Sequence, residues 1–187
     1  MLASVTAMSE ATVSENLSGQ IEQVQSLVEA GDFAGGAEGL AGLRKLWASR
    51  PLSFDQGSLE SLKELALAVE HGLRSRAHSV LQDTFGYSEF RPGQSEIIDS
   101  VLTGQDCIGI MPTGAGKSLT YQLAARVLGG TTLVVSPLIA LMKDQVDGLH
   151  ELGMRATFLN SSIDAAERAD RVARLRNGEY ELVYAAP

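Results

Sequence analysis

The most constraining feature of the sequence is a glycine-rich segment, Met111–Ser118, with the residues Met-Pro-Thr-Gly-Ala-Gly-Lys-Ser. An apolar, strand-like run precedes it and a helical pattern follows it, which is the context of a phosphate-binding loop. Gly114 and Gly116 allow the backbone to adopt positive φ values and to approach a phosphate group closely. Successive N–H groups then face the anion, supported by the positive end of the following helix.

Two residues at the end of this loop supply the remaining chemistry of a nucleotide site. Lys117 brings a compact positive charge to the outer phosphates, and Ser118 offers a hydroxyl group to Mg²⁺. The predicted site also includes three of their neighbours: Thr113, Ala115 and Leu119. The alternative, a glycine turn with a surface lysine, leaves the strand pattern before the loop and the helical pattern after it unexplained.

The part of the chain around the loop alternates short strand-like runs with helical patterns, which is typical of a parallel α/β sheet. Strands are predicted at 107–111, 131–136, 156–159 and 181–185, and helices at 116–128, 138–152 and 165–176. Cys107 is expected to be buried with the first strand. The sequence stops after its last predicted strand, where a doubly wound domain rarely ends, so we expect it to be truncated.

Residues 1–78 follow a different pattern, which is helical and poor in strand-forming residues. The spacing of the apolar residues predicts two helices and a longer third one that leads into the second half. Gly39 and Gly42 weaken the second helix, and Ser58 is placed to cap the third. Residues 1–15 are expected to be frayed. Both a plain helical appendage and a partner-binding module fit this pattern.

Composition and charge exclude several classes of function. The formal net charge is −8, so a general basic coat for nucleic acid is absent and any such contact must be local. The single cysteine excludes a disulfide framework and a Cys-ligated zinc site within this chain. No apolar run reaches the roughly 18 residues of a membrane-spanning helix, and the first residues do not form a standard export signal. We therefore expect a soluble cytoplasmic protein.

A second cluster of functional residues lies upstream of the loop, between Phe85 and Gln94. Gln94 opens a predicted helix, and its carboxamide can donate to adenine and accept from it at the same time. Tyr87 is an aromatic side chain that can stack on a base, whereas Phe85 and Phe90 are more typical of core residues. The cluster predicts an adenine site that accompanies the phosphate loop.

Five motifs together resemble the RecQ family of DNA helicases. They occur in the family's order and spacing at residues 85–94, 111–118, 136–145, 159–162 and 184–187. Met111 stands where the strict phosphate-loop pattern has a glycine, but Pro-Thr-Gly-x-Gly-Lys-Ser is a recognised variant of helicase-type motors. The resemblance covers residues 79–187 and implies the first of two RecA-like lobes, preceded by the helical extension of residues 1–78.

This resemblance implies an ATP-driven motor that uses Mg²⁺, moves 3′ to 5′ on single-stranded DNA and unwinds duplex or forked DNA. By the same resemblance, adenine would be held by Tyr87, Arg91 and Gln94. The path of the strand would be lined by residues of the third and fourth motifs, which include Ser136, Pro137, Leu138, Lys143, Asn160 and Ser161.

Physical arguments support the predicted strand path. Ser136-Pro137 lies at the C-terminal end of a predicted strand, where parallel sheets bind ligands. The helix that opens at Leu138 would present N–H groups to a DNA phosphate, and Lys143 would add a charge. The alternatives are a solvated helix lysine for Lys143 and a simple helix cap for Asn160, Ser161 and Ser162.

Four arginines lie in the last predicted helix, at positions 168, 171, 174 and 176. They could attract DNA, but their spacing favours the solvated face of an amphipathic helix. The apolar side of that helix would consist of Ala165, Ala169, Val172 and Ala173.

Several alternatives for the function remain open. The family's Asp-Glu-x-His motif lies beyond Tyr-x-x-Pro, where this sequence ends, so we expect the chain alone to bind nucleotide weakly and to hydrolyse almost none. A non-catalytic nucleotide- or DNA-binding fragment with a partner-binding extension is one alternative. A DEAD-box-like helicase is another, although such proteins typically have Pro-Thr-Arg-Glu-Leu where this chain has Ser136–Leu141. A P-loop kinase would not need the adenine cluster upstream.

Overall fold

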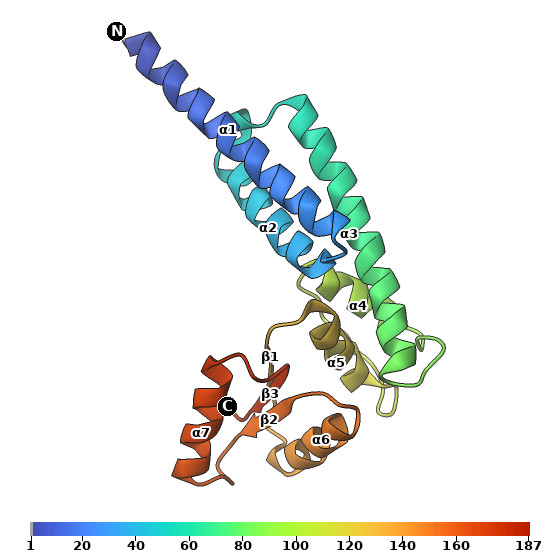
Figure 1. Ribbon diagram of the computed structural model, residues 1–187. Helices are drawn as coiled ribbons and strands as arrows, with labels where there is room; N and C mark the ends of the chain where they lie inside the picture. The colour runs from blue at the N-terminus through green and yellow to red at the C-terminus, as the bar shows by residue number, and fades with distance from the viewer. Residues whose placement is uncertain (1) are drawn as a thin grey trace. The chain divides into compact units, whose positions relative to one another are not determined.

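The computed structural model of the chain describes residues 2–187, with side chains from Asn16 onward. The chain divides into two compact units (Figure 1). The first contains the residues up to Ser75 together with Leu102–Asp106, and the second contains Arg76–Val101 and Cys107–Pro187. All the nucleotide and nucleic-acid residues predicted from the sequence belong to the second unit.

The first unit is helical, as the apolar spacing predicted. Its elements are α1 (Leu2–Glu29), α2 (Phe33–Ser49), a 3-10 turn at Pro51–Ser53, and α3 (Gln56–Asp83), which continues into the second unit. The backbone that was expected to be frayed is helical from Leu2 onward, and its fraying stays a prediction. None of the helices within residues 2–187 combines the length and the apolar character that a membrane crossing requires.

Two glycines in this unit allow its helices to approach closely. A methyl group added at Gly39 of α2 would lie 2.5 Å from Val24 Cγ2 of α1. One added at Gly72 of α3 would overlap the ring of Phe33, the first residue of α2. Gly39 was expected only to weaken its helix, but the packing of α1 on α2 requires the space that a glycine leaves.

The start of α3 differs from the sequence prediction. Ser58 was expected to be the capping side chain, but its own N–H donates to Asp55 Oδ1 at 2.7 Å. Hydrogen bonds from the side chain and the N–H of Ser58 lower the pKa of the Asp55 carboxyl. A carboxylate is a strong acceptor and also interacts favourably with the positive end of a helix, which explains why Asp55 takes the capping role.

The second unit is a parallel α/β arrangement. Its elements are α4 (Gln94–Leu102, with its last residue in the first unit), α5 (Lys117–Leu128), β1 (Thr132–Val135), α6 (Ile139–Glu151), β2 (Ala156–Leu159), α7 (Ala165–Arg176) and β3 (Leu182–Ala185). Strand β3 lies between β1 and β2 and is parallel to both. The connection from β1 through α6 to β2 and the connection from β2 through α7 to β3 cross the sheet in opposite directions. Because connections between parallel strands are right-handed, α6 and α7 lie on opposite faces of the sheet (Figure 1).

The main core of this unit lies where α5 and α6 pack against the sheet. Leu182 and Val183 of the central strand are completely buried. The cluster of buried residues consists of Ala125, Met142, Val146, Leu149, Met154, Ala156, Leu182 and Tyr184. The core therefore joins α5, which begins at the phosphate loop, to the helix that follows β1.

The strand predicted at 107–111 is not formed. This segment is irregular, and Ile108 and Ile110 are 91% and 94% exposed. Cys107, expected to be buried, is exposed as well. A strand requires a neighbour that supplies hydrogen-bond partners, and within residues 2–187 β1 and β2 each pair with β3 and not with this segment. An apolar β-branched run is therefore not sufficient to make a strand.

A buried carboxylate joins the three strands at their N-terminal ends. The backbone N–H of Glu181 donates to Arg155 O at 2.7 Å, and its carbonyl accepts from Thr132 N–H at 2.9 Å. Its side chain accepts from Arg126 Nη1 at 2.6 Å and from Arg155 N–H at 2.9 Å. Burial raises the pKa of this carboxyl, but the hydrogen bonds and the two arginine charges outweigh that effect, so the net pKa is lowered.

We predict that Gly72→Ala destabilises the first unit, because the new methyl group must displace the stiff ring of Phe33. The expected loss is about 1–3 kcal/mol of unfolding free energy. The matched control is Gly42→Ala, where nothing lies within 4 Å of the added methyl group and helix propensity improves by about 1 kcal/mol. Urea unfolding followed by helical circular dichroism measures both variants. Equal effects of the two substitutions would refute the close-packing argument.

We predict that Glu181→Gln lowers the unfolding free energy by about 1–3 kcal/mol at neutral pH. The folded-state pKa of Glu181 lies below its ordinary value of 4.5, so its contribution is complete above that value. It is lost as the pH falls through the lower pKa of the folded state. Thermal melts of both proteins at pH 7 and in acid should therefore converge as the pH falls. A difference that is independent of pH would contradict the assigned role of the charge.

Candidate nucleotide and nucleic-acid sites

The phosphate loop has the backbone conformation that its glycines predicted. Gly114 has a φ of 82° and Gly116 a φ of 79°, both in the left-handed region. Gly116 is the residue that caps α5, and the helix begins at Lys117. A Cβ atom at Gly116 would lie 2.5 Å from Gln94 Nε2. This position therefore requires glycine for two reasons, the positive φ and the close approach of Gln94.

Gln94 is buried, and its side chain forms hydrogen bonds with the backbone of the phosphate loop. Its Oε1 accepts from the Arg91 N–H at 2.8 Å, and its Nε2 donates to the carbonyls of Ala115 at 3.2 Å and Gly116 at 3.0 Å. The side chain is only 1% exposed. The residue predicted to read adenine thus also satisfies two backbone carbonyls of the phosphate loop, a function that the sequence did not reveal.

Two cations make further contacts with carbonyl groups of the loop. Arg91 Nη1 donates to Gly114 O at 2.8 Å. Lys117 Nζ donates to Met111 O and to Pro112 O, both at 2.9 Å. A phosphate group would offer Lys117 a charged acceptor in place of these neutral carbonyls, and charge-assisted hydrogen bonds are stronger. The loop in this form therefore supplies its own acceptors to the lysine that is predicted to bind phosphate.

A small cavity opens beside the loop. It is lined by Tyr87, Glu89, Arg91, Gln94, Gly116 and Leu119. Half of the Tyr87 surface is exposed, so its ring is accessible for stacking. The structure thus brings Tyr87, Arg91 and Gln94 together with the loop, as the adenine prediction requires. Glu89 is a lining residue that the sequence analysis missed, although its place between Tyr87 and Arg91 was a sufficient signal.

The residues of the loop fit a nucleotide and its metal ion. Gly116 has no side chain that would keep a phosphate away from the backbone, and Lys117 is an exposed cation at the start of α5. Ser118 is half-buried in the first turn of the same helix. The described residues contain no cluster of three or more His, Cys, Asp or Glu side chains that could hold a metal. Ser118 is the residue predicted to offer a hydroxyl group to a Mg²⁺ ion.

The stretch that follows β1 is largely exposed, but its N–H groups are not arranged as predicted. The helix begins at Ile139 rather than at Leu138. The Leu138 N–H donates to Ser136 Oγ at 3.2 Å, and the Ile139 N–H donates to Pro137 O at 3.1 Å. Both N–H groups were expected to face a DNA phosphate, and both have acceptors within the turn.

Lys143 is exposed on α6 and is paired with an acidic neighbour. Its Nζ lies 2.8 Å from Asp147 Oδ2, one helical turn further on. The hydrogen bond and the charge of Asp147 raise the pKa of Lys143. A phosphate group would have to compete with Asp147 for this lysine, so its contribution to nucleic-acid affinity is reduced.

Asn160 is buried within its own turn and does not present its amide outward. Its Oδ1 accepts from the N–H of Ser162 at 2.8 Å and from the Ser162 hydroxyl at 2.6 Å. Its Nδ2 lies 3.3 Å from the sulfur of Met142 on α6. Ser161 is exposed and remains accessible. Asn160 therefore shapes the loop, and Ser161 is the residue of the pair that can contact a strand.

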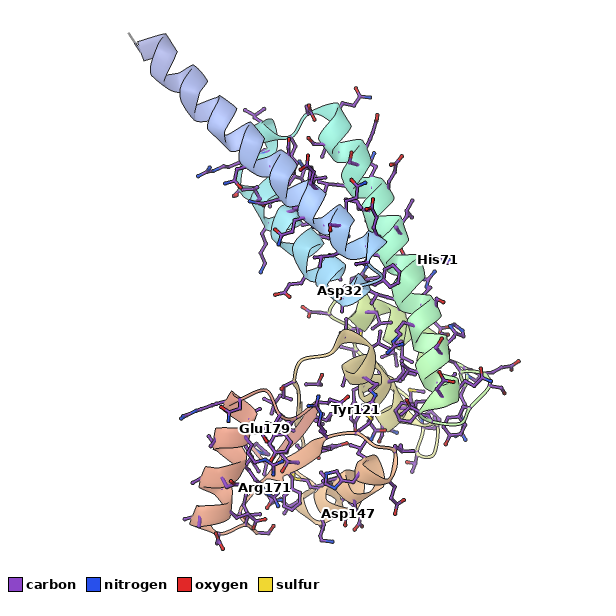
Figure 2. All side chains as sticks on the ribbon, in the orientation of Figure 1. Asp32, His71, Tyr121, Asp147, Arg171 and Glu179 are labelled. Carbon is purple, nitrogen blue, oxygen red and sulfur yellow. The ribbon has the colours of Figure 1, made fainter. Side chains whose placement is uncertain are left out.

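Three of the four arginines of α7 are exposed as expected, at positions 168, 174 and 176, but Arg168 and Arg171 also bind backbone carbonyls, which was not expected. Arg168 donates to Asn160 O at 2.9 Å, and Arg171 donates to Phe158 O at 2.8 Å and lies over the Phe158 ring. Figure 2 shows Arg171 on this helix. The expected apolar side is exposed at Ala165, Ala169 and Ala173, with Val172 half-buried. Arginine side chains reached the carbonyls at the end of β2, which small alanine side chains could not do.

Comparisons with known proteins found a matching family model and related proteins. Residues 91–187 match the family model of the DEAD/DEAH box helicases, which is just over half of the chain. The ATP-dependent DNA helicase RecQ of Haemophilus influenzae is 50% identical over 111 residues, covering 59% of this chain and 18% of that protein. The RecQ of Bacillus subtilis is 49% identical over 113 residues, covering 60% and 19%.

A third relative extends the similarity beyond the predicted boundary. The RecQ of Pasteurella multocida is 44% identical over 142 residues, covering 76% of this chain and 22% of that protein. Residues 79–187 number 109, so this match includes part of the helical extension that the sequence analysis left outside the resemblance. The chain spans about a fifth of the length of these three relatives.

We predict that Gln94→Glu loosens the phosphate loop, because a carboxylate cannot donate to the Ala115 and Gly116 carbonyls. Hydrogen–deuterium exchange of residues 112–117 should accelerate, and the unfolding free energy should fall by about 1–3 kcal/mol. Gln25→Glu, on the exposed surface of α1, is the matched control and should leave loop exchange unchanged. Unchanged exchange in the Gln94 variant would show that its hydrogen bonds do not hold the loop.

Proposed function

The chain belongs to the DEAD/DEAH box helicase family, and from this premise we propose that it forms the nucleotide- and DNA-binding part of an ATP-dependent DNA helicase of the RecQ type. The observation that supports this most directly is the hydrogen-bonded connection from Gln94 and Arg91 to the phosphate loop, beside a cavity that Tyr87 lines. A loop that binds only phosphates would not need this adenine cluster.

In this proposal, adenine occupies the cavity between Tyr87 and Gln94, and the phosphates lie over the N–H groups at the start of α5. Lys117 leaves the carbonyls of Met111 and Pro112 and binds the outer phosphates. The Ser118 hydroxyl holds Mg²⁺, which neutralises charge on the phosphates. Arg91 stabilises the conformation of the loop through its hydrogen bond to the Gly114 carbonyl.

We propose that single-stranded and forked DNA pass the C-terminal ends of β1 and β2. Ser136, Pro137 and Leu138 lie beyond β1, and Ser161 lies beyond β2, with Lys143 on the adjacent helix. These are local contacts, as the net charge of −8 requires. Movement from 3′ to 5′ and roles in DNA repair and recombination rest on the RecQ resemblance alone. So does a place in the cytoplasm, at the bacterial nucleoid, or in the nucleus of a eukaryotic cell.

A protein partner for residues 1–78 is the second part of the proposal. Leu52, in the 3-10 turn, is completely exposed, and Trp47 near the end of α2 is 48% exposed. Exposed large apolar side chains such as these two are candidates for contact with a partner. Trp47 is the sole tryptophan of the sequence, so its fluorescence reports directly on any contact at this end of α2.

We predict that Lys117→Ala weakens binding of a fluorescent ATP analogue at least about tenfold, because the phosphates lose their charged partner. Lys63→Ala, an exposed lysine in the first unit, is the control and should bind as the wild type does. Equal affinities of the two variants would overturn the nucleotide site. In a competition assay with oligonucleotides, a preference for single-stranded RNA over DNA would overturn the DNA part of the proposal.

A further inference from the structure

Four polar side chains meet inside the second unit, between α5, α6 and β3. The hydroxyl groups of Tyr121 and Tyr184 are 3.3 Å apart, and Gln122 Nε2 lies 3.3 Å from the Tyr184 hydroxyl. Gln122 Nε2 also lies 3.4 Å from Gln145 Oε1 on α6. Figure 2 labels Tyr121 where it projects from α5. The nucleotide site described above does not use any of these four residues.

The cluster connects α5, which begins at the phosphate loop, with α6, which begins at the predicted DNA path. Tyr121 and Gln122 lie one helical turn beyond Lys117 and Ser118, so they share the faces of those residues on α5. Gln145 lies on α6, the helix that follows the predicted strand path.

The strand next to the cluster also touches the start of the predicted strand path. Ala185 follows Tyr184 in β3, and its carbonyl accepts from the Ser136 N–H at 3.0 Å. The end of β3 therefore contacts α5 through the Tyr184 side chain and the segment before α6 through the Ala185 backbone.

The Tyr184 hydroxyl is placed where its hydrogen bonds have large consequences. The residue is 3% exposed and packs with Met142, Leu182 and Ala125 in the core. Burial raises the pKa of its phenol, with a further contribution from Tyr121. The group therefore stays protonated, and a hydroxyl in an apolar core is costly without partners. The cluster responds as a unit when one of its helices moves.

Lys117, the first residue of α5, would exchange its acceptors when phosphates bind. In the structure, Lys117 donates to the carbonyls of Met111 and Pro112. Phosphates would draw the same side chain toward themselves. A shift of the first residues of α5 on nucleotide binding would reach Tyr121 and Gln122, because helical hydrogen bonds join residues that are four positions apart. Such a shift alters the distances to Tyr184 and, through it, the position of α6.

We propose that Tyr184 is a positioning residue that couples nucleotide binding at the phosphate loop to DNA binding at the start of α6. This inference rests on the proposed function and goes beyond it, because it concerns the connection between the two sites. The coupling is reciprocal: ATP changes the DNA affinity by the factor by which DNA changes the ATP affinity. A factor of about 5 or more is expected for a connection of this kind.

The experiment uses the complete 187-residue chain and a labelled single-stranded oligonucleotide. Fluorescence anisotropy gives the DNA affinity with and without a saturating non-hydrolysable ATP analogue and Mg²⁺. Calorimetry gives the analogue affinity with and without the oligonucleotide. Tyr184→Phe retains the ring and removes only the hydroxyl, so each separate affinity should stay within about twofold of the wild type. The ratio between the two DNA affinities should move toward one.

Tyr180→Phe is the matched control, because Tyr180 is equally buried and precedes β3 at its other end. It should leave the ratio at the wild-type value. Gln122→Met is the second variant, since it removes the α5 donor to Tyr184 and keeps a side chain of similar length. It should lower the ratio as Tyr184→Phe does.

The outcomes separate this inference from the function on which it rests. A wild-type ratio of one, or a wild-type ratio retained in the Tyr184 and Gln122 variants, overturns the coupling and leaves the two sites standing. A wild-type chain that binds neither the analogue nor the oligonucleotide overturns the proposed function, and the coupling falls with it. A ratio lowered equally by Tyr180→Phe shows a general effect of tyrosine hydroxyls and also overturns the role of Tyr184.

Discussion

The second unit depends on the pairing of β3 with the strands on both of its sides. Within the described residues, β1 and β2 form their ladders with β3, so the sheet exists only when this strand is in place. Glu181 fixes its beginning through Arg126 and Arg155, and Leu182 and Val183 bury their side chains completely. The carbonyl of Ala185 then fixes the segment beyond β1. Structure and predicted function therefore converge on a strand of only four residues.

A second constraint acts at the phosphate loop. A backbone that turns its N–H groups toward an anion turns its carbonyls elsewhere, and buried carbonyls need donors. Gln94 supplies donors to Ala115 and Gly116, and Arg91 supplies one to Gly114. Arg91 and Gln94 of the predicted adenine cluster thus stabilise the loop conformation and also line the cavity beside it. In the proposed site, the residues that would recognise the base are therefore the ones that stabilise the loop.

Much of this architecture could be predicted from the sequence, because alternating apolar patterns and glycine positions are local signals. The strand at 156–159 and the helix at 165–176 were predicted with their observed limits. The errors concern partners that a sequence does not display. Residues 107–111 have strand composition but no ladder, and Ser58 was preceded by the better acceptor Asp55. Arg168 and Arg171 of α7 bind backbone carbonyls that the sequence pattern does not indicate. Asn160 was predicted to line the DNA path because of its residue type. Its burial and its hydrogen bonds to Ser162 show instead that it shapes the turn after β2.

The acidity of the chain determines how the DNA contacts can work. With a net charge of −8, and with Lys143 paired to Asp147, counterion release would contribute little to the affinity of the proposed DNA path. The other contacts proposed are exposed polar groups beyond β1 and β2, such as the Ser161 hydroxyl, and the strength of their hydrogen bonds depends on direction and distance. Affinity that depends on geometry changes when a helix shifts, whereas affinity from diffuse charge does not. A chain of this composition is therefore suited to nucleic-acid binding that a nucleotide controls through the position of α6.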